Sequence, residues 1–192
     1  MNPIQMDTPY ETQTDEELAL AIQSGDEEPF GVLMDRYGKK LMRYGRKFLS
    51  NPDNIEDLVQ DIFIKVYQNI QSFDAERKFS PWIYRIAHNS FINHMRKNAN
   101  EPLLVFNFDA LIDHPVYKDP LVEQKENEEL RVLVERGIEQ LPPLYREVVT
   151  LHYFEDLGYQ EIAEVLHIPI GTVGVRLRRA REILSKHIEY EQ

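Results

Sequence analysis

The residues whose chemistry stands out first lie near the C-terminus, where four arginines accompany a helical apolar repeat. Val173, Leu177 and Ala180 form this repeat, and Ile168-Pro169 separates it from an earlier helical run over residues 159–166, because proline disfavours helical geometry in the residue before it. Two short helices, a tight turn and a basic second helix predict a helix-turn-helix, whose second helix enters the DNA major groove. The alternative is an ordinary helical hairpin with a solvated arginine face. The arginines are Arg176, Arg178, Arg179 and Arg181.

A second group combines aromatic, amide and cationic side chains on a predicted helix over residues 81–98. Ser80 is a good N-cap, and Pro81 suits the first helical position. Bases stack on aromatic rings at about 1–3 kcal/mol each and cations follow the phosphates, so one face of this helix suits single-stranded DNA. A lone tryptophan is more often a core residue, and both interpretations of Trp82 stay open. The face carries Trp82, Arg85, Asn89, Asn93, Arg96 and Lys97.

A third group consists of polar side chains on the most regular predicted helix, residues 54–69. Its apolar residues recur at i, i+3, i+4 and i+7, which leaves Asp57, Gln60 and Asp61 mostly on other faces. These side chains form either a docking face for a partner or a solvated acidic face. Acid/base catalysis is a weaker hypothesis, because nothing nearby resembles a nucleophile or a metal cluster.

The pattern of motifs does not favour an enzyme. His88 and His94 lie six residues apart and do not share a helix face well, so we expect no metal site. The sequence also lacks a phosphate-binding loop and a nucleophile–base pair, and we expect neither a catalytic residue nor a cofactor.

The distribution of charge indicates DNA contact at two places and a further source of affinity. The formal net charge is −11, whereas a protein that binds DNA unaided usually has a basic balance. Positive charge is nevertheless concentrated, with five cations and one acid in residues 75–97 and the same numbers in residues 171–187. Residues 98–130 between them carry eight acids and two lysines. We therefore expect a partner to supply the binding strength that the whole chain lacks.

The elements that position these groups are predicted to be helices throughout. Residues 1–13 suggest a disordered polar tail, and Thr14 with Glu17 forms a capping-box signature for a helix that ends near Ser24-Gly25. Further helices are expected over about 29–49, 54–69, 81–98, 126–140 and 144–153, with a polar loop over 73–80 and a proline-containing linker over 101–123. No apolar run approaches the roughly 20 residues that cross a bilayer, and we expect no membrane insertion. The absence of cysteine fits a reducing cytoplasm.

Three of these segments resemble parts of one protein family. Residues 141–184, LPPLYREVVTLHYFEDLGYQEIAEVLHIPIGTVGVRLRRAREIL, resemble the C-terminal promoter-binding domain of bacterial extracytoplasmic-function sigma factors. The segments EDLVQDIFIKVYQ and FSPWIYRIAHNSFINHMRK resemble the N-terminal domain of that family, in the same order. The resemblance implies an all-α protein with two small helical domains: a tail over 1–13, a region 2 domain over 14–98, a flexible acidic linker over 99–124, and a region 4 helix-turn-helix domain over 125–192.

The resemblance also implies a set of contacts. The family binds the beta and beta-prime subunits of RNA polymerase core, promoter DNA and often an anti-sigma factor, and it has no catalytic or metal site of its own. Core binding would involve Asp57, Gln60, Asp61 and Lys65. The promoter −10 element would be opened and held by Phe73, Phe79, Ser80, Trp82, Arg85, Asn89, Asn93, Arg96 and Lys97. The −35 element would be read by Gly171, Thr172, Arg176, Arg178 and Arg179.

The chain departs from the family pattern at several positions. Gly174 and Val175 replace the lysine and serine that are usual in the reading helix, which makes Arg176 and Arg179 the expected DNA contacts. His167 stands where glycine is common in the turn, and Asn93 stands where aspartate is common. The predicted function is that of an alternative sigma factor in the cytoplasm. A sigma-like decoy for an anti-sigma protein and a stand-alone helix-turn-helix regulator are the alternatives.

Overall fold

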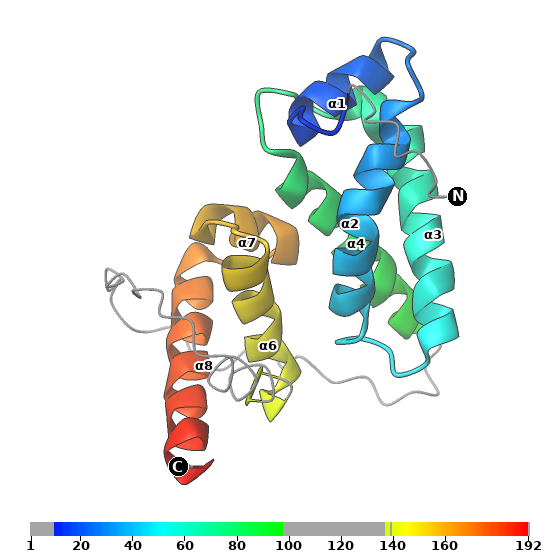
Figure 1. Cartoon of the computed structure of the whole chain (residues 1–192). Coiled ribbons are helices and arrows are strands. Elements are labelled where there is room, and N and C mark those ends of the chain that lie inside the picture. The colour runs from blue at the N-terminus through cyan, green and yellow to red at the C-terminus, as the bar shows by residue number, and fades with distance from the viewer. Residues whose placement is uncertain (1–9, 98–136, 139, 192) are drawn as a thin grey trace, which may run out of the picture. The chain divides into compact units, whose positions relative to one another are not determined.

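The computed structural model describes residues 10–97, 137, 138 and 140–191, and it divides the chain into two compact units, one within residues 1–97 and one within residues 98–192 (Figure 1). Within the described part of the chain every regular element is a helix, which confirms the predicted all-α class. No helix there is both long and apolar enough to cross a membrane. The predicted linker and most of the predicted helix over 126–140 lie outside the described residues.

The N-terminal unit packs its helices around a core rich in aromatic rings. Tyr44 is fully buried, and its ring lies 5.3 Å from that of Tyr84 and 6.2 Å from that of Phe91 between centroids. The Phe48 ring stacks on Phe91 at 5.2 Å. Gly45 is also buried, and it lets the end of α2 approach Ile55 and Phe91 closely. The elements are α1 (Asp15–Gln23), α2 (Pro29–Gly45), α3 (Pro52–Asn69), a short 3-10 helix η1 (Ile70–Ser72) and α4 (Phe79–Lys97).

Local sequence signals set several of these boundaries. The capping box at Thr14 is present, since its side chain accepts from the Glu17 amide and Glu17 accepts from the Thr14 amide. Gly25 follows the helix at φ +98°, a left-handed conformation that glycine adopts without a Cβ clash. At α3 the Asn51 side chain accepts from the Asp53 amide, so the helix begins two residues earlier than predicted.

Three other boundaries also differ from the predicted ones. α2 ends at Gly45 and not near Leu49, because the chain tightens into i→i+3 bonds there, from Lys47 N to Tyr44 O and from Phe48 N to Gly45 O. α4 begins at Phe79, so Ser80 is not its N-cap. The predicted disordered tail is too long, since residues 10–13 form a turn and the Tyr10 hydroxyl donates to Asp26 at 2.7 Å.

The C-terminal unit contains the predicted helix-turn-helix. Its elements are α6 (Pro143–Val149), a π-helical turn (Thr150–Phe154), α7 (Tyr159–Leu166) and α8 (Ile170–Glu191). Val173, Leu177 and Ala180 are fully buried, as their spacing predicts. Tyr153 is about half exposed, so the apolar pattern predicted through 153 does not continue into the core.

The turn between α7 and α8 depends on an unusual conformation at His167. This residue caps α7 in the left-handed region at φ 54° and ψ 44°, and the amide of Ile168 then donates to Ala163 O at 3.1 Å. A left-handed C-cap is normally glycine, because a Cβ is disfavoured there. The turn therefore keeps the geometry of a helix-turn-helix at some cost in conformational energy.

Candidate nucleic-acid interface

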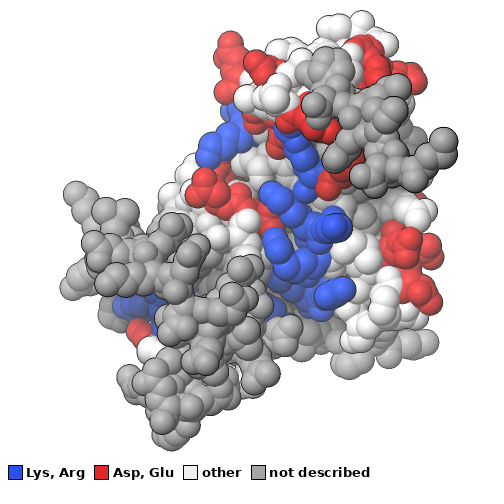
Figure 2. Space-filling model, in the orientation of Figure 1, with Lys and Arg blue, Asp and Glu red and all other residues white. Residues whose placement is uncertain are grey.

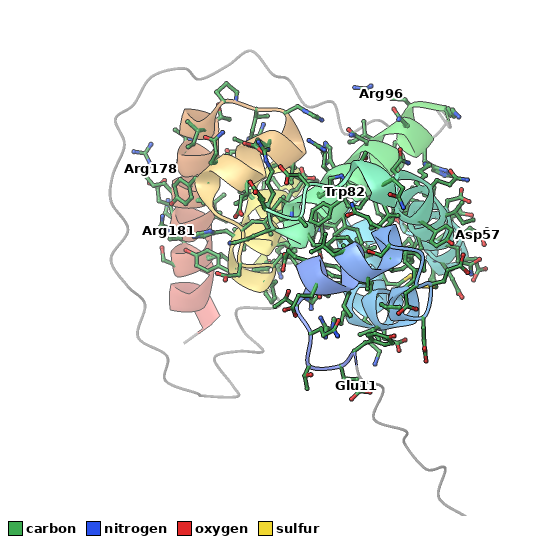
Figure 3. The ribbon with its side chains drawn as sticks, turned by 90° about the horizontal axis from the view of Figure 1, so that it is seen from above. Glu11, Asp57, Trp82, Arg96, Arg178 and Arg181 are labelled. Carbon is green, nitrogen blue, oxygen red and sulfur yellow. The ribbon has the colours of Figure 1, made fainter. Side chains whose placement is uncertain are left out.

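The outer face of α4 brings together most of the side chains predicted to bind the −10 element. Arg85, Asn89, Asn93 and Arg96 are all exposed, and at about 100° per residue they lie within one arc of roughly 80°. Trp82 lies within this arc at the start of the helix and is half-buried, and both Trp82 and Arg96 are labelled in Figure 3. The exposed Lys97 closes the helix. The face therefore presents one partly exposed indole at the start of α4, followed along the helix by exposed amides and cations.

Two phenylalanines predicted to contact DNA are instead buried beneath that indole. Phe73 is 5% exposed and Phe79 is 0% exposed, so neither ring can meet a base in this structure. Their centroids lie 5.3 and 5.5 Å from that of Trp82, and the Tyr37 ring packs on Phe79 at 5.5 Å. Their role as DNA contacts is therefore wrong for this conformation, because the apolar ends of the loop close the core. They fix the position of Trp82 instead.

Helix α1 holds both ends of the loop between η1 and α4. The Gln23 amide group donates to Ile70 O at 2.7 Å and to Phe73 O at 2.8 Å. At the other end, the Glu16 carboxylate accepts from the Phe79 amide at 2.8 Å and so caps α4 from another helix. A carboxylate at this place also complements the positive end of the helix dipole. This contact explains why α4 starts before Ser80, which is half-buried inside its first turn.

A buried hydroxyl–carboxylate contact strengthens the same junction. The Tyr37 hydroxyl donates to Asp15 at 2.5 Å, and Arg36 pairs with the other oxygen of Asp15 at 2.6 Å. Burial, and then the hydrogen bond to Asp15, raise the pKa of Tyr37 well above its ordinary value. The hydroxyl therefore stays protonated and keeps α1 attached to α2 next to Phe79.

Replacing Gln23 with leucine is expected to loosen the loop without changing the fold. The substitution keeps the volume but removes the side-chain donor of Phe73 O and one of the two donors of Ile70 O, which costs about 1–3 kcal/mol. Amides in residues 73–79 should then exchange with solvent about tenfold faster or more, as measured by hydrogen–deuterium exchange of the full chain. Ser24→Ala is the matched control, since it removes a side-chain bond to Leu20 O at the end of α1 and does not touch the loop. Unchanged protection in Gln23→Leu would show that Gln23 does not hold the loop.

The polar face of α3 is exposed as predicted. Asp57, Gln60 and Asp61 are all solvent-exposed, and Figure 3 shows Asp57 on the side of the N-terminal unit away from Trp82. Lys65 is also exposed along its stem, but its Nζ donates to Ser90 Oγ of α4 at 2.9 Å. The sequence interpretation missed Ile64, which lies among these residues and is 54% exposed. An exposed isoleucine in a polar row is the signal that could have indicated a protein-binding surface.

The solvent face of α8 carries four of the five predicted −35 residues. Gly171 and Arg178 are exposed, and Thr172 and Arg179 are half-buried beside them. Arg178 also pairs with Glu182 one turn later, at 3.7 Å between Nε and Oε1. Figure 3 labels Arg178 on this helix.

Arg176 lies at the edge of this face, about 40° around α8 from Thr172, and it is half-buried. Burial is the main cause that lowers its pKa, and the charges of Glu147 and Tyr145 on α6 oppose that shift. Glu147 is only 3% exposed. Arg176 therefore interacts with α6, and the spacing could have shown this, because Arg176 lies three positions after Val173 and four before Ala180, both buried.

Gly174 lies against the first helix of the motif. A Cβ added there would lie 3.6 Å from the Tyr159 ring, which is an ordinary van der Waals distance. The Tyr159 ring in turn packs edge-on against His152 at 5.3 Å. The glycine is therefore not required by packing.

A concentration of cations on α2 was not predicted as a site. Exposed Lys39, Arg43 and Arg46 recur at i, i+4 and i+7, and Figure 2 shows cations gathered in a column over this helix. Among the described residues no group of three His, Cys, Asp or Glu side chains is arranged to hold a metal ion. The arrangement as a whole offers surfaces for phosphates, bases and a protein partner.

Both units of the chain match known protein families. The sigma-70 region 2 family matches residues 33–101, and the sigma-70 region 4 family matches residues 131–184. The ECF RNA polymerase sigma factor SigW of Bacillus subtilis is 35% identical over 178 residues, which cover 87% of this chain and 92% of that protein.

Solved structures agree with the sequence matches. The structure of CnrH in complex with the cytosolic domain of CnrY has a TM-score of 0.62 at 26% identity and covers 94% of this chain and 100% of that one. The sigma factor RpoE in complex with the anti-sigma factor NepR from Bartonella quintana shares the fold, with a TM-score of 0.59 at 24% identity over 85% of this chain and 98% of that one. With both sigma-70 regions present in order and a relative this similar over most of its length, the chain belongs to the ECF RNA polymerase sigma factors.

Proposed function

We propose that this protein is an alternative sigma factor that binds RNA polymerase core and directs promoter recognition, DNA opening and transcription initiation. The observation that carries the proposal is the pairing of an exposed amide-and-cation face on α4 with a helix-turn-helix in a second unit. An initiation factor needs these two surfaces, whereas the bond-forming chemistry belongs to the polymerase. The cytoplasm, where the polymerase works, is the proposed location.

Core binding is assigned to the exposed face of α3. Asp57, Gln60 and Asp61 offer carboxylates and an amide to the beta and beta-prime subunits, and Ile64 adds an apolar contact at the centre. Lys65 has a different role in this proposal, since its ammonium group joins α3 to α4 through Ser90. Binding to a large partner also resolves the charge problem, because a chain of net charge −11 would otherwise be repelled by DNA.

Opening of the −10 element is assigned to Trp82 and the α4 face. Extracting a base from the duplex costs a few kcal/mol, and stacking on an aromatic ring returns about 1–3 kcal/mol of this. Arg85 and Arg96 would follow the phosphates of the unpaired strand, while Asn89 and Asn93 offer hydrogen bonds to base edges. The buried pair Phe73 and Phe79 supports the indole from below.

Reading of the −35 element is assigned to the solvent face of α8. Arg178, Arg179 and Thr172 lie on this face, and Gly171 lets the first turn of the helix approach the DNA backbone closely. Arg176 is assigned to the packing between α8 and α6 because it lies beside the buried Glu147.

Two arginine substitutions should separate reading from packing. Arg179→Gln is expected to weaken promoter binding by about 5- to 150-fold, which corresponds to 1–3 kcal/mol, with an unchanged melting temperature. Arg176→Gln should instead lower the melting temperature, because Glu147 loses a neighbouring positive charge. Electrophoretic mobility shift with reconstituted holoenzyme and thermal unfolding of the free chain measure the two effects. A reversed pattern would assign base or phosphate contact to Arg176.

Run-off transcription with purified core polymerase tests the function as a whole. Start sites mapped after overexpression would first supply the promoter, and the chain should then be required for transcription from it. A stand-alone regulator would bind this DNA without the core. A decoy, consistent with the Gly174-Val175 departure, would bind an anti-sigma factor without initiating. An anti-sigma factor is the further partner that we propose, and its addition should abolish the run-off product.

A further inference from the structure

The basic side chains of α2 form one stripe along the helix. Six cations and no acid occupy residues 36–47. At about 100° per residue, the four that lie within α2 fall in an arc of roughly 100° on one side of the helix, and the other two follow in the turn after Gly45. Figure 2 shows positive charge gathered on this side of the N-terminal unit. The six are Arg36, Lys39, Lys40, Arg43, Arg46 and Lys47.

Three cations of this stripe have described contacts with the protein and are half-buried. Arg36 donates to Asp15 at 2.6 Å and to the backbone oxygen of Glu11 at 2.7 Å. The Nζ atoms of Lys40 and Lys47 each lie 5.3 Å from a tyrosine ring centroid, those of Tyr37 and Tyr44. These three cations border the core and are half-buried. They account for part of the positive charge as ordinary packing and ion pairing.

Three cations of the stripe are exposed, whatever contacts they make within the protein, and are here called the α2 ridge: Lys39, Arg43 and Arg46. From Lys39 to Arg46 the helix rises about 10 Å, since each residue adds 1.5 Å. Each strand of B-DNA advances about 3.4 Å along the duplex axis per phosphate, so a ridge that lies parallel to this axis matches a run of about three phosphates. Cations also stabilise the negative end of a helix dipole, but that effect is confined to the last turn and does not explain Lys39.

We infer that the α2 ridge binds the phosphodiester backbone of promoter DNA, as a third contact besides α4 and α8. The inference rests on the proposed function. The ridge belongs to the same unit as the α4 face, and the two helices are joined by the Tyr44 hydroxyl and His88 Nδ1 at 3.2 Å and by packing of the Phe48 and His88 rings. Phosphate contacts on α2 would hold DNA in register for Trp82 without reading its sequence.

The test uses holoenzyme reconstituted from core polymerase and the full chain, with salt dependence of promoter binding as the readout. Lys39→Gln combined with Arg46→Gln removes two cations, which should reduce the slope of log K against log salt by about 1.8. Between 50 and 200 mM salt the wild-type complex should therefore weaken about twelvefold more than the double variant. Arg43→Gln should reduce the slope by about 0.9, and Arg43→Lys should restore it, because a lysine also binds a phosphate.

Separate DNA fragments identify the strand that is bound. A duplex promoter, a promoter with a pre-opened bubble and the isolated non-template strand are compared, and a reduced slope on any of them supports the inference and locates the contact. An unchanged slope on all three, with wild-type holoenzyme still forming promoter complexes, overturns it. So does a loss of core affinity with unchanged DNA binding, because the ridge would then face the polymerase. If wild-type holoenzyme forms no promoter complex, the proposed function itself has failed.

Discussion

Trp82→Ala should slow formation of the open promoter complex by about 5- to 150-fold while leaving the closed complex nearly unchanged. This range converts the 1–3 kcal/mol of base stacking into a rate at 1.4 kcal/mol per tenfold. The indole is half-buried and rests on the rings of Phe73 and Phe79, so it is held in place before any DNA arrives. Removing it takes away the surface on which an extracted base would stack.

Permanganate reactivity of unpaired thymines measures opening, and mobility shift at low temperature measures the closed complex. Trp82→Phe is the matched control, because a phenyl ring still stacks and should recover most of the opening rate. Thermal unfolding excludes a general loss of structure. Equal losses in the closed and open complexes would remove the stacking role and leave Trp82 as a packing residue.

Gly45→Ala is expected to destabilise the N-terminal unit by about 1–3 kcal/mol, although alanine is normally the better helix former. A Cβ at this position would lie 2.7 Å from Ile55 Cγ2 and 2.7 Å from Phe91 Cζ. Both neighbours are buried, so neither can move aside without disturbing the core. The gain in helix propensity, about 0.5–1 kcal/mol, is therefore smaller than the cost of overpacking.

Gly174→Ala provides a control of opposite sign. The same substitution there meets only the Tyr159 ring at 3.6 Å, so the propensity gain of about 0.5–1 kcal/mol should appear as added stability of the C-terminal unit. Urea unfolding followed by near-ultraviolet circular dichroism can monitor both variants. A stabilised Gly45→Ala variant would mean that α2 and α4 can separate without cost.

Local periodicity predicted the parts of the fold that depend on a single helix. The apolar stripe of α3 and the capping box at Thr14 are both present because each involves residues within a few positions of one another. The exposed row on α4 was predictable for the same reason. In these segments the helical repeat alone determines which side chains face the solvent.

Contacts between distant segments could not be read from the sequence. Phe79 is the first residue of α4 because Glu16, 63 positions earlier, accepts its amide hydrogen. Lys65 looked like a free member of a polar face, but its ammonium group is bonded to Ser90 of another helix. Arg176 was a partial exception, since its place beside buried positions on α8 could have been derived from spacing.

The junction between α1 and the loop determines how this unit can be isolated. The region 2 match starts at residue 33, after the whole of α1. A fragment cut at that limit would lack Glu16 and Gln23, so the start of α4 would be uncapped and two loop carbonyls would lose their side-chain donor. It would also lack Asp15, so the Tyr37 hydroxyl, whose ring packs on Phe79, would lose its hydrogen-bond partner. A recombinant fragment for binding or crystallisation trials should therefore begin before Tyr10.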